Sequence, residues 1–190
     1  SEKVQVPAEV GGDGGGNTGI FTSNGGRFDY AALRSARMML MEYSFPHYLL
    51  SKQSVDDRAL NKDVLSALRA NLPKEPFRII EVGAGIGTML KRLVRWDVIR
   101  QAEVVLVDEM AENIEYASEW AKVWAGQAGL SVERSGSSIR LFDKAHDIKV
   151  QLEQADVFEF IQKNKEPADL LIAHAFLDLL PMPESLPKLL

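Results

Sequence analysis

The chain has 190 residues, of which 46% are hydrophobic and 26% are charged, and its formal net charge at pH 7 is −5. This composition is typical of a soluble globular protein, with one domain or one domain plus an appendage. The acidic balance argues against sequence-independent binding of nucleic acid, which depends on Lys and Arg. The chain has no cysteine, so disulfides, cysteine-ligated zinc and thiol nucleophiles are excluded.

No apolar run approaches the ~18 residues that a membrane helix needs. The N-terminus also lacks the basic start and apolar core of a signal peptide. We therefore expect a cytoplasmic protein that does not contact a membrane, and we identify no metal site. Lys91, Arg92 and Arg95 form a basic cluster, which we interpret as the solvated face of a helix.

Residues 1–27 are rich in glycine and predict a flexible tail, because ordering glycine costs much entropy and buries little; a lid over a site is the alternative. Residues 28–76 predict a helical extension with two helices. The first ends where Pro46 interrupts it. The second spans 54–73, with Ser54 as the N-cap and Asp57 in the capping-box position. Its apolar stripe comprises Leu60, Val64, Leu65 and Leu68.

Residues 77–190 predict a doubly wound α/β domain, because short buried strands alternate with amphipathic helices. Strands are expected at 77–83 and 103–108, and the segment 168–180 predicts a further buried strand that runs into a loop or helix. Helices are expected at 88–101, 109–129, 157–164 and near the end of the chain. The intervening segment contains two extended runs, 138–142 and 149–153. We expect these runs to form a hairpin-like elaboration that leads into the third strand.

A glycine loop follows the first strand, with Gly83, Gly85 and Gly87 at alternate positions. Such a loop brings backbone N–H groups and a helix N-terminus close to a ligand. The spacing differs from the dinucleotide-binding G-x-G-x-x-G pattern, in which Thr88 would be glycine. It also differs from a P-loop, which ends in Gly-Lys-Ser/Thr, since the first lysine after Gly83 is Lys91.

The pattern E-x-G-x-G-x-G resembles motif I of the class I S-adenosylmethionine-dependent methyltransferases. The resemblance implies that Glu81 holds the methionine ammonium group of S-adenosylmethionine. It also implies that the loop backbone approaches the amino-acid and ribose parts of this cofactor, at Gly83, Ala84, Gly85 and Gly87.

The resemblance continues at the next two strand ends. It places Asp108 on the ribose hydroxyls, with Glu109 beside it and Met110 packed on adenine. It places Asp156 and Val157 at the adenine edge. From the residues alone, either aspartate could instead cap the helix that follows it.

His174 lies at the end of the last strand, where this family places the methyl-donor end of the cofactor. A structural role for this histidine is the alternative, and no catalytic residue is identified. The segment lacks the Asn/Asp-Pro-Pro-aromatic motif of enzymes that methylate base amines or protein glutamine. We therefore expect a small-molecule or protein substrate.

The resemblance covers residues 77–190 and supplies the first four of the family's seven strands, with the fourth beside the first. We accordingly expect a Rossmann-like methyltransferase sheet that is incomplete at the C-terminus through truncation. An exposed strand at 169–173 would then favour pairing with a second copy. The predicted function is S-adenosylmethionine-dependent methyl transfer. The alternatives are a catalytically inactive interaction domain and an NAD-binding oxidoreductase.

Overall fold

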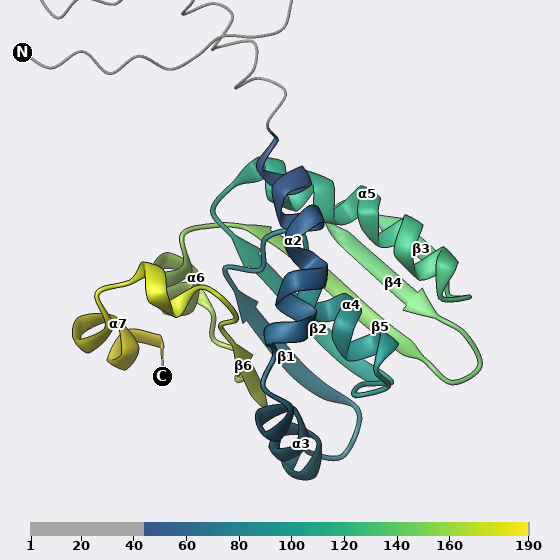
Figure 1. Ribbon diagram of the computed structural model, residues 1–190, viewed down its shortest axis with the longest axis horizontal. Coiled ribbons are helices and arrows are strands. Elements are labelled where there is room, and N and C mark those ends of the chain that lie inside the picture. Colours follow the sequence, from purple (N-terminus) through teal and green to yellow (C-terminus); the bar gives the residue numbers. More distant parts are fainter. Residues whose placement is uncertain (1–43, 190) are drawn as a thin grey trace, which may run out of the picture. The chain divides into compact units, whose positions relative to one another are not determined.

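The computed structural model describes residues 44–189. The predicted glycine-rich tail and most of the first predicted helix lie outside this range. The described residues fall in one compact unit, 41–190, and contain a mixed α/β fold with a single six-stranded sheet (Figure 1). No helix in this part of the chain is both long and apolar enough to cross a membrane.

The sheet has the strand order β3-β4-β5-β2-β1-β6. Four adjacent strands, β5, β2, β1 and β6, are parallel. Their order reverses at β1, which lies between β2 and β6, so the chain has the doubly wound topology that was predicted. The strands are β1 (Phe77–Val82), β2 (Gln101–Asp108), β3 (Ser131–Ser135), β4 (Ser138–Phe142), β5 (Asp147–Gln154) and β6 (Leu170–Ile172).

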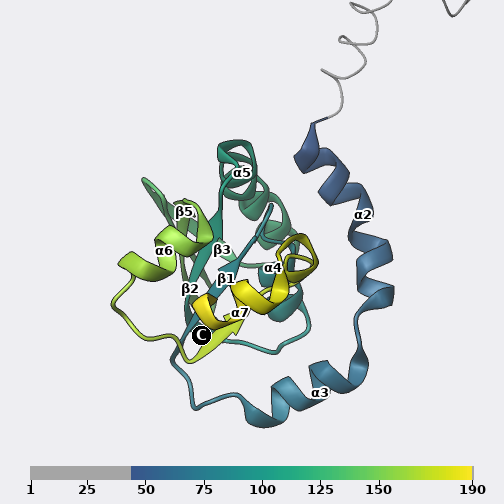
Figure 2. The same ribbon diagram turned by 90° about the vertical axis from the view of Figure 1, so that its left-hand side faces the viewer.

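The central strands are apolar on both faces because helices cover both faces. In β1, Ile79 and Ile80 point to opposite sides, and both are buried. The helices α4 (Thr88–Arg95) and α5 (Ala111–Gln127) contribute to the larger core. The helices α6 (Val157–Lys163) and α7 (Met182–Leu189) contribute to the smaller core on the opposite face (Figure 2).

The prediction that the fourth strand lies beside the first is confirmed, since β6 pairs in parallel with β1. The strand β6 has only three residues and is half-buried, whereas a buried strand was predicted. The 3₁₀ turn η1 (Leu177–Leu179) follows it. Within the described residues β6 pairs only with β1, and pairing of its other edge with a second copy stays a prediction.

The segment before α6 matches the prediction in part. The runs 138–142 and 149–153 do pair antiparallel as a hairpin, but the run 149–153 does not precede the third strand. It belongs to the third parallel strand, β5, which pairs with β2 along its whole length. The elaboration is the antiparallel pair β3–β4, and β4 also pairs antiparallel with β5. The strand β3 was not predicted because its side chains are largely exposed and polar.

The N-terminal helices also begin and end at different residues than predicted. Pro46 does not interrupt a helix but lies in the first turn of α2 (Phe45–Ala59), where a missing N–H costs nothing. Ser54 is inside α2 and is not an N-cap. The N-cap is Asn61, which begins α3 (Lys62–Asn71) and accepts hydrogen bonds from the backbone N–H groups of Asp63 and Val64.

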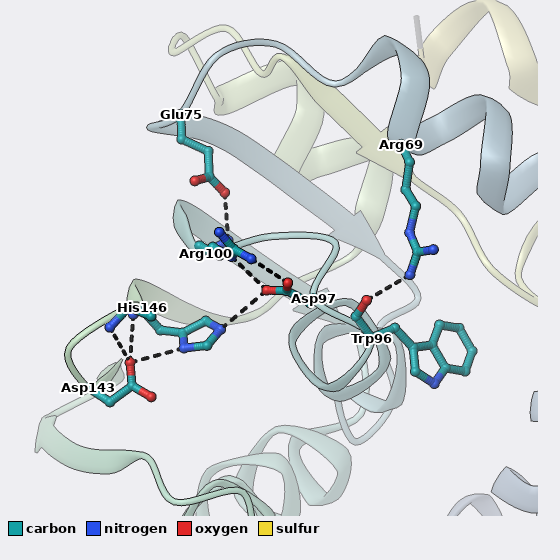
Figure 3. A network of polar contacts seen from close by, with 8 residues as sticks. Arg69, Glu75, Trp96, Asp97, Arg100, Asp143 and His146 are labelled. Carbon is teal, nitrogen blue, oxygen red and sulfur yellow. Dashed lines mark hydrogen bonds and ion pairs between the residues drawn. The ribbon is translucent and has the colours of Figure 1, made fainter.

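A polar network braces the sheet at the amino-terminal ends of its strands (Figure 3). Its centre is Asp97, which accepts hydrogen bonds of 2.7 and 2.5 Å from the Arg100 guanidinium group. The backbone N–H of Arg100 donates to Glu75, and the network extends through His146 to Asp143. These contacts connect the segments before β1, β2 and β5, at the end of the sheet opposite the candidate site.

Candidate functional site

A cavity of about 300 Å³ lies at the carboxyl-terminal ends of the parallel strands. Open α/β sheets bind their ligands at this edge, where the strand order reverses. Larger hollows of about 610 and 440 Å³ lie over the polar sheet face around β4 and β5 and at the amino-terminal ends of the strands, and one of about 390 Å³ lies beside the segment that follows α6. Charged side chains there, such as Lys149 and Glu103, are paired with each other. We therefore take the smaller cavity as the candidate site.

The cavity has a glycine-loop wall, an acidic wall and an apolar rim. Its lining comprises Phe45, Leu49, Gly83, Gly85, Asp108, Glu109, Met110, Asn113, Asp156, Val157, Phe158, Ala175, Phe176, Leu179 and Leu180.

The glycine loop has a left-handed backbone, with φ of +62°, +55° and +75° at Gly83, Gly85 and Gly87. A side chain at Gly83 would also collide with Phe176, since a Cβ atom there would lie 2.3 Å from the ring carbon Cδ2. A Cβ atom at Gly85 would lie 2.9 Å from Leu49 Cδ1. Leu49 and Phe176 thus lie directly over the loop and form the glycine end of the cavity.

Asp108 connects this loop to the start of α5. Its Oδ2 atom accepts a hydrogen bond of 2.7 Å from the backbone N–H of Gly85. Its Oδ1 atom accepts bonds of 3.0 Å from the backbone N–H of Met110 and 2.9 Å from the Asn113 amide. A carboxylate has about four acceptor positions, so these three bonds leave Asp108 about one position for a ligand hydroxyl. Asp108 therefore shapes the loop as well as lining the cavity.

Asp156 begins α6 at the end of β5. Its side chain accepts a hydrogen bond of 2.9 Å from the backbone N–H of Glu159, so it is the N-cap of this helix. Asp156 and Val157 also line the cavity, together with Asp108 and Met110. The capping role and the predicted ligand role can coexist, because a carboxylate can accept further hydrogen bonds.

Near the loop, the pKa shifted furthest from its ordinary value is that of Glu81. It is only 4% exposed, and its Oε2 atom has no hydrogen-bond partner within the described residues. Burial raises the pKa of this carboxyl group from 4.5 to about 8, the positive charge of Arg92 opposes the rise, and Asp108 adds to it. Glu81 therefore carries a proton at pH 7 when nothing else compensates its charge.

A second polar cluster lies between α2, α4 and the end of β6. Arg92 is 2% exposed, and its Nε atom donates a hydrogen bond of 2.5 Å to Asp57. Its other nitrogens contact the Thr88 hydroxyl and the Gln53 carbonyl. Burial, reinforced by the charge of Arg92, lowers the pKa of His174. His174 is therefore a neutral imidazole near a buried cation.

Seven of the eleven predicted site residues line the cavity, namely Gly83, Gly85, Asp108, Glu109, Met110, Asp156 and Val157. The other four, Glu81, Ala84, Gly87 and His174, do not. Ala84 is buried, and its backbone N–H donates to the carbonyl of Val107. Gly87 is the N-cap of α4. The ligand roles of all eleven residues stay predictions.

Two interpretations of charged residues were wrong. Arg92 does not belong to a solvated helix face, since it is buried and paired. Asp57 does not cap a helix, since it lies inside α2 and binds Arg92. The sequence also gave no indication that Asn113 would bond to Asp108 or that Leu49 would cover Gly85. Only the spacing of Asn113 from Asp108 across the start of α5 could have suggested the first contact.

No protein-family model matches this chain, and no curated protein matches its sequence. Among solved structures, it is similar to the plantazolicin methyltransferase BpumL in complex with SAH, with a TM-score of 0.41 and 18% identity over 66% of this chain. It is also similar to the same enzyme with a triazolic desmethylPZN analog and SAH, with a TM-score of 0.40 and 17% identity over 86% of this chain.

The chain spans 38% and 48% of the lengths of those two structures. Similarity at this level is too remote to carry an argument about activity.

Proposed function

We propose that this chain binds S-adenosylmethionine at the carboxyl-terminal edge of its sheet and takes part in methyl transfer to a small molecule or protein. The observation that carries the proposal is the hydrogen bond between Asp108 and the backbone of Gly85. It joins the strand-end acid and the glycine loop at one cavity, which also reaches Asp156 at the third strand end. The three elements that the sequence resemblance associates with this cofactor thus share one site.

The residues present fit the chemical groups of the cofactor. The rim of Met110 and Phe158 offers apolar surface for a purine, and Asp156 offers an acceptor for an exocyclic amine. Asp108 retains acceptor capacity for a ribose hydroxyl. The unpaired, buried oxygen of Glu81 suits a ligand ammonium group. Glu81 itself does not line the cavity, but it precedes the cavity-lining Gly83 by two positions.

When bound, S-adenosylmethionine supplies a methyl group that is already activated by its sulfonium. The chain then has to hold and orient the reactants and exclude water, which needs few chemically reactive side chains. The covering of the glycine loop by Leu49 and Phe176 suits the exclusion of water. Such a site explains why the sequence predicts a cofactor site and identifies no catalytic residue.

Equilibrium dialysis with radiolabelled S-adenosylmethionine and, separately, NAD tests the proposal. We expect saturable binding of S-adenosylmethionine and no comparable binding of NAD. The variant Asp108→Asn should weaken this binding by roughly 1.5–3 kcal/mol, since it replaces a charged acceptor by an amide. As a matched control, Glu103→Asn changes an exposed acid at the other end of the same strand and should bind normally. Preferential binding of NAD would refute the proposal in favour of an oxidoreductase.

A further inference from the structure

We infer that the methyl acceptor is a small, uncharged aromatic molecule, which binds at the β1–β6 end of the cavity against Phe45, Phe176 and Leu179. This inference rests on the proposed function and narrows its substrate class. Three features of the cavity carry it: the division of its lining into an acidic and an apolar end, the signs of its charges, and the large apolar side chains exposed at its mouth.

The strand order divides the cavity lining into two ends. At the ends of β5 and β2, the lining contains the acids Asp156, Asp108 and Glu109. A purine on Met110 and Phe158 and a ribose on Asp108 would occupy this acidic end. At the ends of β1 and β6, beside the glycine loop, the lining is apolar. This apolar end, which is left for the acceptor, comprises Phe45, Leu49, Ala175, Phe176, Leu179 and Leu180.

The walls of the apolar end are held by local structure. Ala175 has a left-handed backbone with φ of +52°, and strain of this kind in a residue other than glycine occurs most often at functional sites. The turn η1 follows, and the backbone N–H of Leu179 donates a hydrogen bond of 3.0 Å to the carbonyl of Phe176. On the side of α2, the Ser44 hydroxyl donates a bond of 2.8 Å to Glu112 of α5. Both walls are therefore in place before a ligand binds.

Large apolar side chains are exposed at the mouth of the apolar end. Leu179 is 74% exposed and Phe45 is 40% exposed, although both line the cavity. Phe45 also stacks on Tyr48 of the same helix, with ring centroids 5.9 Å apart. Exposed apolar side chains around a concave site are typical of ligand binding. An aromatic acceptor would cover this surface.

The charges of the lining determine which acceptors are excluded. The lining contains three acids, and no lysine, arginine or histidine of the described range contributes to it. A carboxylate or phosphate on the acceptor would therefore be repelled and would find no basic partner. A cation at the apolar end would lose hydration without gaining a polar partner there, which is costly. An uncharged acceptor avoids both costs.

Isothermal titration calorimetry on the full chain saturated with S-adenosylhomocysteine tests the inference with three probes. 2-Naphthol is uncharged and aromatic, and 2-naphthoate has the same rings with a negative charge. N-acetylphenylalaninamide presents an aromatic side chain on a peptide backbone. We expect 2-naphthol to bind saturably and at least about tenfold more tightly than either other probe, because a carboxylate or backbone amides would lose hydration against the apolar end.

A pair of variants locates the binding site of the probe. Leu179→Ser should weaken 2-naphthol binding on the order of 5- to 20-fold, as the loss of a partly buried apolar contact implies. The affinity for S-adenosylhomocysteine should change less than about threefold. The control Val64→Ser removes an apolar side chain that is 64% exposed in α3 and does not line the cavity. It should bind 2-naphthol as the wild-type protein does.

The outcomes separate the inference from the proposed function. S-adenosylhomocysteine binding without saturable 2-naphthol binding, or with tighter binding of 2-naphthoate, would overturn the inference and leave the proposed function standing. The same holds if Leu179→Ser leaves 2-naphthol binding unchanged or weakens both ligands equally. Tighter binding of N-acetylphenylalaninamide would overturn it in favour of a protein acceptor. Failure of S-adenosylhomocysteine to bind would refute the proposed function and the inference together.

Discussion

Replacement of Glu81 by glutamine should change how the stability of the protein depends on pH. The folded state keeps the proton on Glu81 up to a pKa of about 8, whereas the unfolded chain releases it near the ordinary value of 4.5. The folded state is therefore favoured most at low pH, and the free energy of unfolding falls as pH rises through the window between these two values. Glutamine has the shape of the protonated group and does not titrate.

The magnitude follows from the shift, at about 1.36 kcal/mol for each pH unit. Between pH 5 and pH 8.5, the wild-type protein should lose on the order of 4 kcal/mol of unfolding free energy relative to Glu81→Gln. Urea denaturation of both proteins at pH 5, 7 and 8.5 measures this difference, and contributions of other groups cancel. A difference that stays constant over this range would show that Glu81 is ionised in the folded protein, which would refute the argument from burial.

Two further predictions concern the loop and the adenine wall. Gly83→Ala should destabilise the fold more than Gly136→Ala does, by about 2 kcal/mol. Both positions have a left-handed backbone, so the backbone strain is common to the two variants. Of the two, only Gly83 has a neighbour, the ring of Phe176, in the way of a new Cβ atom, and equal unfolding midpoints would contradict that contact. Asp156→Ser should keep the cap on Glu159 and change stability by less than about 1 kcal/mol. It should weaken S-adenosylhomocysteine binding in calorimetry, and unchanged affinity would leave Asp156 with a capping role alone.

The sequence predicted those features that depend on local pattern. The strands β1 and β2 are continuous apolar runs because both of their faces are covered, and such runs are recognisable without knowledge of their neighbours. The glycine loop and Asp108 follow directly from the ends of these strands. Their juxtaposition could be predicted because the carboxyl ends of adjacent parallel strands meet at one edge.

The features that were missed depend on contacts between distant segments. Nothing local to Arg92 or Asp57 indicates that they pair, since they are separated by 35 positions and belong to different helices. In a helical pattern, a paired buried arginine looks the same as an exposed one. The sequence also did not show that the run 149–153 belongs to the third parallel strand. This run pairs antiparallel with β4, and nothing in its residues indicates that its other edge pairs with β2.

The central claim is that the cavity at the carboxyl-terminal edge of the sheet binds the cofactor, and NMR tests it most directly. Backbone amide shifts of the full chain would be followed during titration with S-adenosylhomocysteine. We predict saturable shifts that are largest at Gly85, Met110 and Val157, which lie on three different elements around the cavity. Amides of the polar network at the opposite end of the sheet, at Arg100 and His146, should be unaffected. Saturable shifts centred on that opposite end, or none at any residue, would contradict the account.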